Sequence, residues 1–568
     1  MTRKAPLCAA QILFLILAAA IPASAADKQS GTSASTSQEV NQLKIQLADQ
    51  QRQIEELRAA LQKLVADRQQ AAPEGGSQPA SVQAPASGPP QLGQVASTTP
   101  IVPVAPATSA PLALPMPVVV PPQAMAAPES PLQFHIGSAA ITPVGFMDFT
   151  TVFRTSNPGS GIGTNFGSIP YNNAINGRNT ELRLSAQNSR IGLRVDANVH
   201  GAKVLGYLES DFLGFNPPNV AVTSNSNSLR LRLYWVDVRK DKVELFAGQS
   251  WSMLTPNRKG LSALPGDLFY SQDIDVNYQN GLVWSRNPQF RFIVHPNDKV
   301  AMGISLENPE QYIGGSGGGG LITLPAALAT PYANQLNNGN TTLSVPDVHP
   351  DLIAKLAFDP SSRAHLEVAG VFRTFRVWDP VNTTHFTSHG GGGSVNFNFE
   401  LAHGFRLISN NYWSDGGGRW IFGLAPDLVV RPNGSLSPLH AGSTVDGFEL
   451  QAKHTLFYAY YGGTYIGRNT VVDTGGKLAG YGYAGSPNSQ NRVIHEPTFG
   501  LTQTFWRDPR YGALQLMLQY SYLLRDPWAV ASGTPKDAHA SMVFINLRYL
   551  LPGSAPQPEL PALPLKTP

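Results

Sequence analysis

The sequence predicts an all-β protein, a transmembrane antiparallel β-barrel of about 16 strands that spans residues 134–551. Three observations predict this fold. Strand-like segments alternate apolar with polar residues, very short turns alternate with long polar connections, and a short apolar leader opens the chain. Barrels of bacterial outer membranes are built this way, with tight turns in the periplasm and long loops outside. A soluble β-sandwich has no reason to sort its connections by length so regularly.

The alternation is clear in several segments, because successive side chains of a strand point to opposite faces. Residues 393–402 set Val, Phe and Leu on one face against Ser, Asn and Glu on the other, and 189–199 and 511–525 behave similarly. Residues 229–233 alternate leucine with arginine, which predicts Leu233 on the lipid face. A soluble sheet with one wet face gives the same pattern. The membrane barrel is therefore indicated by the number of such segments and by aromatic residues near their ends.

The connections fall into two classes. The short ones lie near residues 200–201, 240–242, 296–298, 359–363, 403–404, 453–454 and 507–510. The long ones are predicted at about 155–178, 214–228, 253–280, 308–349, 379–392, 415–444, 468–492 and 526–538. With an even strand number, both ends of the barrel lie in the periplasm.

The first 25 residues have the features of a secretory signal peptide. Arg3 and Lys4 precede an apolar run, and Ala23-Ser24-Ala25 forms a small-residue cleavage site. The run is too short to span a bilayer as a helix. The only cysteine, Cys8, lies in this segment, so we expect a mature protein without disulfides or thiol chemistry.

Residues 37–68 predict a periplasmic α-helical coiled coil, because apolar residues recur with heptad spacing. Its seam consists of Val40, Leu43, Leu47, Gln50, Ile54, Leu57, Leu61 and Leu64. A single amphipathic helix docked on the barrel is the alternative, and the seam does not decide between dimer and trimer. Residues 71–131 form a Pro/Ala-rich linker, and 552–568 a Pro-rich tail; both compositions predict disorder.

Four segments carry a family resemblance: 188–193 (NSRIGL), 209–214 (ESDFLG), 248–252 (GQSWS) and 287–292 (NPQFRF). In this order they resemble strand motifs of the DcaP-like trimeric outer-membrane porin family, which also has a coiled-coil segment before the barrel. The resemblance spreads over about residues 134–551. It implies a 16-stranded homotrimer in outer-membrane lipid that admits small, preferentially anionic solutes such as dicarboxylates. Two features depart from the family: the linker is long, and the chain continues beyond its last strand instead of ending there on an aromatic residue.

If the apolar residues face lipid, their polar neighbours line an aqueous lumen. The lumen then includes a row of arginines: Arg183, Arg190, Arg194, Arg230, Arg232, Arg291 and Arg373. Guanidinium groups in a narrow pore favour anions, because a low-dielectric wall focuses their field and each group can hold a carboxylate through two hydrogen bonds. The structural alternative is that these arginines pair with Glu181, Asp196, Glu209 and Asp211 and support the wall.

Loop 253–280 follows the fifth strand, where general porins fold a constriction loop inward. Its charged residues are Arg258, Lys259, Asp267, Asp273 and Asp275. Opposed charges across a constriction would tune passage by size and charge. An ordinary external loop is the alternative interpretation.

No motif implies a cofactor, a metal or an enzyme. The glycine run at 314–320 lacks the Lys-Ser/Thr of a phosphate loop, and His385 and His389 lie in a glycine-rich segment without metal-ligand spacing. A net charge of +3 is too small to indicate nucleic acid.

The sequence therefore predicts an outer-membrane porin that passes small hydrophilic, anionic solutes by passive or facilitated diffusion. The second hypothesis is a structural tether: the coiled coil contacts a periplasmic partner or the cell wall, and conduction is incidental. The third, an outer-membrane lipase, would need Ser, His and a carboxylate at one strand edge. Nothing in the sequence places these residues together.

Overall fold

The computed structural model describes residues 130–214, 228–268, 279–315, 319–339 and 345–552. The predicted signal peptide, coiled-coil seam, linker and tail lie outside these ranges, apart from the last linker residues and Pro552. Asp273 and Asp275 of the predicted constriction loop also lie outside them.

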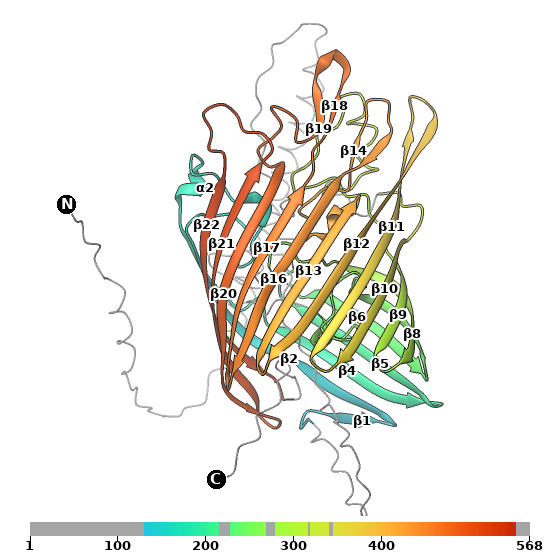
Figure 1. The fold of residues 1–568 in the computed structure, drawn as a ribbon, viewed down its shortest axis with the longest axis vertical. Coiled ribbons are helices and arrows are strands. Elements are labelled where there is room, and N and C mark those ends of the chain that lie inside the picture. Colours follow the sequence, from blue (N-terminus) through green and yellow to red (C-terminus); the bar gives the residue numbers. More distant parts are fainter. Residues whose placement is uncertain (1–129, 215–227, 269–278, 316–318, 340–344, 553–568) are drawn as a thin grey trace, which may run out of the picture. The chain divides into compact units, whose positions relative to one another are not determined.

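The described residues contain a closed antiparallel β-barrel (Figure 1). Its strands are β2 (Ala139–Arg154), β3 (Glu181–Ser185), β4 (Arg190–Val199), β5 (Ala202–Asp211), β6 (Arg230–Lys240), β7 (Val243–Trp251), β8 (Arg286–Asn297), β9 (Val300–Glu307), β10 (Asp351–Ser361), β11 (Ala364–Asp379), β12 (Thr384–Ala402), β13 (Phe405–Asp415), β16 (His440–Ala452), β17 (Thr455–Ile466), β20 (Asn491–Asp508), β21 (Gly512–Pro527) and β22 (Ala538–Leu550).

The barrel closes because β2 pairs with the last strand, β22, on one edge and with β3 and β4 on the other. The sheet has 18 strands in total. One of them, β1 (Phe134–Ile136), pairs only with the start of β2, and β3 and β4 are two parts of a single wall strand. The wall therefore has 18 − 1 − 1 = 16 strands, which confirms the predicted fold class.

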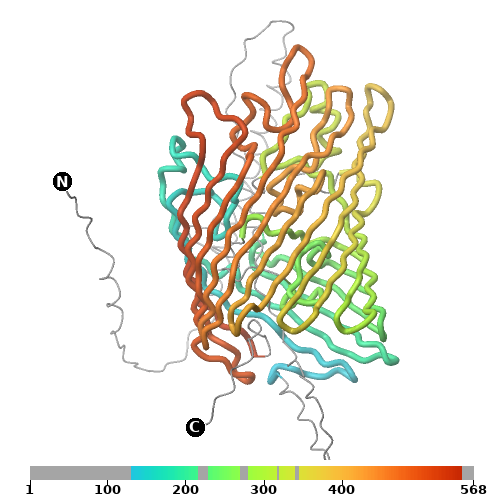
Figure 2. The backbone as a smooth tube through the Cα atoms, in the orientation of Figure 1, coloured from blue at the N-terminus to red at the C-terminus, as the bar shows by residue number. Residues whose placement is uncertain are grey.

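The two ends of the barrel differ as the connection lengths predict. Tilted strands run between short turns at one end and long connections at the other (Figure 2). At the turn between β4 and β5, His200 and Gly201 both have positive φ, 48° and 78°. This is the backbone of a two-residue hairpin turn that matches strand twist. In outer-membrane barrels the short-turn end is the periplasmic one.

The long connections hold small elements of their own. Two ribbons pair β14 (Leu428–Val430) with β15 (Leu436–Pro438) and β18 (Asn469–Val472) with β19 (Leu478–Tyr481). The short helices are α2 (Ile175–Arg178), η1 (Phe166–Ser168), η2 (Pro265–Asp267), η4 (Gly418–Trp420) and η5 (Thr474–Gly476). Within the described ranges, no helix is long and apolar enough to cross a membrane.

The predicted long connection at 379–392 is wrong. β11 continues to Asp379 and β12 begins at Thr384, so only four residues join them. The glycine run 390–393 lies in β12, paired with β11 throughout and with β13 from Gly391 onward, and His385 and His389 lie in the same strand. Backbone hydrogen bonds to the neighbouring strands hold these glycines extended despite their low strand propensity.

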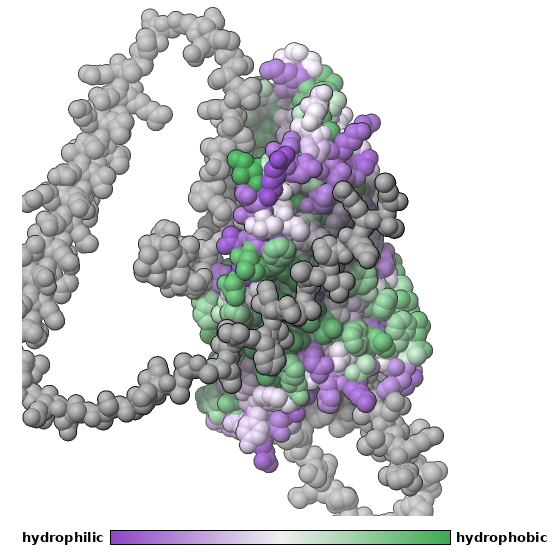
Figure 3. Space-filling model, turned by 90° about the vertical axis from the view of Figure 1, so that its left-hand side faces the viewer, coloured by the Kyte–Doolittle hydropathy of each residue, from purple (hydrophilic) through white to green (hydrophobic). Residues whose placement is uncertain are grey.

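The outer face of the wall carries the predicted apolar residues. On β12, Val395 and Leu401 are 48% and 63% exposed, while Asn396 and Asn398 on the other face are 1% and 0% exposed. Figure 3 shows hydrophobic residues gathered across the middle of the visible wall and hydrophilic residues toward its top and bottom. Such a band suits the hydrocarbon region of a membrane.

The prediction for Leu233 is wrong, because β6 contains a bulge. The register between β5 and β6 shifts at Glu209 and Ser210, which pair with Leu233 and Leu231. An extra residue in one strand turns the following side chains to the opposite face. Leu233 is consequently buried, whereas Leu231 and Tyr234 are exposed.

Candidate functional site: the barrel lumen

The described parts of the connection between β7 and β8 lie inside the barrel. These parts, 252–268 and 279–285, contact the inner faces of strands far round the wall. We call residues 252–268 and 279–285 the inward loop.

The first half of the inward loop is held by carboxylates of β9 and β11. The Met253 N–H donates to Glu307 Oε1 at 2.8 Å, and the Asn257 N–H donates to Glu367 Oε2 at 3.2 Å. Lys355 of β10 is buried and forms an ion pair with Glu367 at 2.8 Å. The ion pair compensates both buried charges, so the carboxylate can also accept the loop's N–H.

Arg258 joins the inward loop to the other side of the lumen. Its Nη2 lies 2.6 Å from Glu449 Oε1, and its Nη1 donates to Oε2 at 3.2 Å. Glu449 belongs to β16, the twelfth wall strand, whereas the loop leaves the wall after the fifth. This two-point contact is the geometry that makes an arginine–carboxylate pair strong and directional. The inward loop therefore crosses the barrel interior.

The second half of the inward loop lies against β17 and β20. The Asn280 N–H donates to Glu496 Oε2 at 2.7 Å, and its Nδ2 donates to the Ile494 carbonyl at 2.8 Å. Gly281 has φ +88°, and a Cβ there would lie 2.4 Å from the Thr444 carbonyl oxygen. Only glycine fits both this backbone conformation and this close approach.

Three of the predicted pore arginines meet at Glu209 and Asp211 of β5. Arg190 lies 3.3 Å from Glu209, and Arg230 lies 2.7 Å from Asp211. Arg232 contacts Glu209 and also lies 2.8 Å from Asp211, and the Arg232, Glu209 and Asp211 side chains are fully buried. The cluster is a compact ion-pair network within the wall, since each guanidinium has a carboxylate partner.

The other predicted arginines lie apart from this cluster. Arg183 contacts Glu181 with its side chain 47% exposed, Arg194 pairs with Asp196 at 2.7 Å, and Arg373 pairs with Asp427 at 2.7 Å and Asp351 at 3.1 Å. Arg291 stacks over the Phe246 ring at 4.7 Å and donates to Gln289 Oε1 at 2.7 Å. Six of the seven arginines thus have carboxylate partners.

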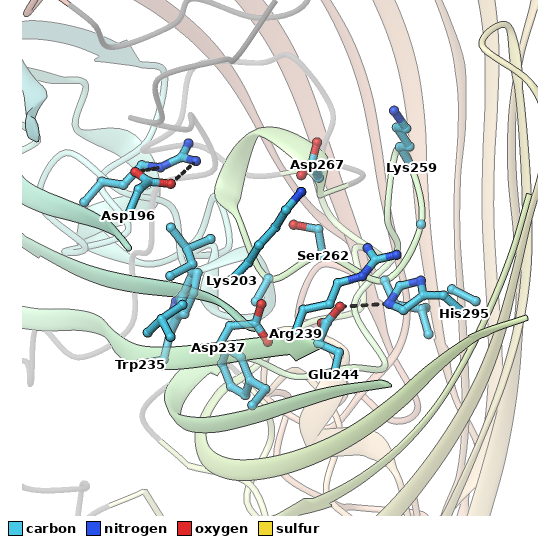
Figure 4. A pocket seen from close by; sticks show the side chains of 18 of the residues that line it. Asp196, Lys203, Trp235, Asp237, Arg239, Glu244, Lys259, Ser262, Asp267 and His295 are labelled. Carbon is cyan, nitrogen blue, oxygen red and sulfur yellow. Dashed lines mark hydrogen bonds and ion pairs between the residues drawn. The ribbon is translucent and has the colours of Figure 1, made fainter. Parts of the chain in front are cut away.

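A cavity of about 700 Å³ lies between the inward loop and the wall formed by β4 to β8 (Figure 4). We call it the vestibule cavity. It reaches the short-turn end, because Asn297 and Asp298 of the β8–β9 turn help to line it. Lys259 and Asp267 of the predicted constriction loop line it as well.

The vestibule cavity also contains two cations that the sequence analysis missed, Lys203 and Arg239. Both belong to the polar face of their strands, close to a short turn, so the alternation pattern contained the signal. The carboxylates that hold the inward loop, Glu307, Glu367, Glu449 and Glu496, were also missed. Their role depends on a loop that is distant in sequence.

Burial raises the pKa of the Asp267 carboxyl above its ordinary value, although a hydrogen bond with Ser262 and the charge of Lys259 oppose the rise. Among the described residues, no group of three or more His, Cys, Asp or Glu side chains could hold a metal ion.

The closed wall and the inward loop define the porin class of β-barrel. Among solved structures, the chain is similar to the outer membrane channel DcaP of Acinetobacter baumannii, with a TM-score of 0.53 and 17% identity over 73% of this chain and 97% of that chain. It also matches the anion-selective porin from Comamonas acidovorans, with a TM-score of 0.42 and 11% identity over 72% of this chain and 99% of that chain. No family model and no curated protein matches. At these identities the likeness concerns the fold.

Proposed function

We propose that the protein is an outer-membrane porin that forms an aqueous channel for small hydrophilic, preferentially anionic solutes. The observation that carries this proposal is the inward loop, held across a polar lumen by Arg258 and Glu449. A loop held across a barrel narrows the passage while leaving the wall intact, which is how a channel discriminates by size.

The inner face supports an aqueous passage. On β12 it carries Ser394, Asn396 and Asn398, and on β21 it carries Gln519 and Ser521. These side chains are buried, and polar groups on the inside of a barrel prefer water-filled or hydrogen-bonded surroundings, as the inner wall of an aqueous channel requires.

The preference for anions is supported by cations of the lumen that have no carboxylate partner. The predicted arginine row supplies little free charge, because most of its members are ion-paired in the wall. Among the described residues, Lys203, Arg239 and Lys259 form no ion pair. Cations that face water beside a low-dielectric wall attract anions into the lumen.

We further propose that the barrel assembles as a homotrimer in outer-membrane lipid. In this proposal the predicted coiled coil of residues 37–68 lies in the periplasm. There it joins protomers or contacts a periplasmic partner or the cell wall.

The test is the reversal potential of the purified protein in a planar bilayer under a KCl gradient. We expect stepwise conductance and a reversal potential of the sign that chloride selectivity produces. Folded protein that shifts on heating in gel electrophoresis but carries no ion current would contradict the proposal. A cation-selective current would contradict only its anionic part.

A further inference from the structure

The vestibule cavity has features of a binding site in addition to those of a passage. It lies on the short-turn side of the inward loop, so a solute that has passed the loop reaches it next. Figure 4 shows Lys203 of β5 and Arg239 of β6 reaching into the cavity, and Lys259 of the inward loop also lines it. Three cations from three separate elements therefore surround one space.

Two of these cations are neighbours in the sheet. Lys203 of β5 and Arg239 of β6 are direct cross-strand partners, with both side chains on the lumen face. Like charges in directly opposite positions repel and destabilise a sheet. An anion bound between the two cations would relieve this repulsion. In a pathway that never binds an anion, the repulsion would remain uncompensated.

Three of the six carboxylates that line the vestibule cavity already have ion-pair partners. Asp196 is bound by Arg194 at 2.7 Å, and Glu244 by His295 at 2.8 Å. Asp359 contacts His365 at 2.8 Å and also accepts the Gly260 N–H at 3.0 Å. These acids therefore compete weakly with a bound anion for the cations.

Three carboxylates of the cavity remain without an ion pair among the described residues. Asp237 of β6 lies next to Glu244 of β7, Asp267 belongs to the inward loop, and Asp298 belongs to the exposed short turn.

The cavity also offers an unused hydrogen-bond donor. Trp235 lines it and is only 5% exposed, and its Nε1 has no hydrogen-bond partner among the described residues. A buried indole N–H usually finds an acceptor, so this unpartnered donor in the cavity wall is unusual.

We propose that the vestibule cavity binds a small multivalent anion, carrying carboxylate or phosphate groups, through Lys203, Arg239 and Lys259. This inference rests on the proposed channel function and adds a place where the solute pauses on the periplasmic side of the inward loop. Lysine supplies a point charge to such a group, and arginine can bind two of its oxygens.

The experiment measures block of the single-channel KCl current by citrate and, separately, by inorganic pyrophosphate. Each probe is added to each side of a bilayer that contains the full-length protein. We expect wild type to show reversible block, and Lys203→Gln and Arg239→Gln each to weaken the apparent affinity about tenfold, the loss of one charged hydrogen bond. Lys240→Gln is the matched control. It removes the same charge one residue away, outside the cavity lining, and should leave block unchanged.

Each outcome decides a separate point. Block by citrate alone or by pyrophosphate alone assigns the ligand to carboxylates or to phosphates. A conducting wild type that neither probe blocks, or variants blocked as strongly as wild type, would overturn the site and leave the channel standing. Calorimetric titration of the detergent-solubilised protein covers the case without current. If the protein carries no current but binds a probe, and Arg239→Gln weakens that binding, the anion site is retained and the channel function is rejected. If the protein carries no current and binds neither probe, both proposals are rejected.

Discussion

The Arg258–Glu449 ion pair holds the inward loop to a strand far round the barrel. Replacing Arg258 with glutamine removes this pair, although the anchors at Met253 and Asn257 stay. We expect the free energy that holds the inward loop to β16 to fall by about 1.5–3 kcal/mol, the usual contribution of a hydrogen bond to a charged group. The loop should then fluctuate, and single-channel recordings should show additional current levels and more noise.

Arg492→Gln is the control for this change. Arg492 pairs with Asp526 at 3.3 Å on a more exposed part of the wall, so its loss should leave the current levels unchanged. A quiet Arg258→Gln channel with wild-type conductance would show that the ion pair does not hold the loop.

Asp347 lies in the connection between β9 and β10, and we expect it to make the stability of the folded protein depend on pH. Burial and the nearby charge of Glu310 raise the pKa of Asp347 from 3.8 to about 6. The folded protein then holds this proton more tightly than the unfolded chain does, so stability falls as the pH rises from about 4 to about 6. Asp347→Asn removes this loss. Its thermal midpoint should exceed that of wild type by about 1–2 °C at pH 7.5, with no difference at pH 4. Equal differences at both pH values would contradict this assignment.

The position of the inward loop against the wall depends on the close approach of Gly281 to β16 and β17. A Cβ at Gly281 would meet the carbonyl oxygens of Thr444 and Gly463 at 2.4 and 2.7 Å. Gly475 also has positive φ, but a Cβ there has no neighbour within 4 Å. Both alanine variants carry about 1–2 kcal/mol of backbone strain. Only Gly281→Ala adds a steric clash, so we expect it to lower the thermal midpoint further and to change the conductance.

The β5–β6 pair depends on the buried ion-pair network around Arg232. Arg232→Ala leaves Glu209 and Asp211 without one of their charge partners, which should destabilise the barrel by about 3–5 kcal/mol. Arg194→Ala breaks a more exposed pair with Asp196 and should cost less than about 1 kcal/mol. Heat-modified mobility in gel electrophoresis measures the difference. Equal midpoints for the two variants would mean that Arg232 is dispensable to the wall.

At the scale of the whole molecule, the barrel can be tested without the residues before it. A variant that lacks residues 27–130 but keeps the signal peptide tests whether the barrel conducts alone. Because the described wall closes through β2 and β22, we expect wild-type reversal potential and unit conductance, with fewer simultaneous steps if the coiled coil joins protomers. If the truncated barrel folds but carries no current, or if its reversal potential changes sign, the tether hypothesis would be favoured.

The architecture was predictable because its signals are local. Apolar–polar alternation identified the outward residues of β12, and short polar sequences such as His200-Gly201 identified the hairpin turns. Where a local signal was ambiguous, the prediction was wrong. The glycines at 390–393 resemble a loop but lie in β12, and the bulge that buries Leu233 leaves no mark in the alternation.

The lumen was predictable only in part, for a related reason. Alternation places Arg190 and Arg232 on the inner face, but it does not show that Glu209 lies between them. That contact requires the register of three strands. Similarly, the sequence indicates that Arg258 belongs to a loop after the fifth strand, but not that it reaches Glu449.

By itself, the sequence determined the fold class, the strand number and the inward and outward faces of most strands, because these follow from a two-residue period and from connection lengths. Only the tertiary structure decided where the inward loop is held, which arginines are neutralised, and that Lys203, Arg239 and Lys259 share one cavity. The physical reason is that ion pairing and cavity shape arise between strands distant in the chain, and closing the barrel sets their register.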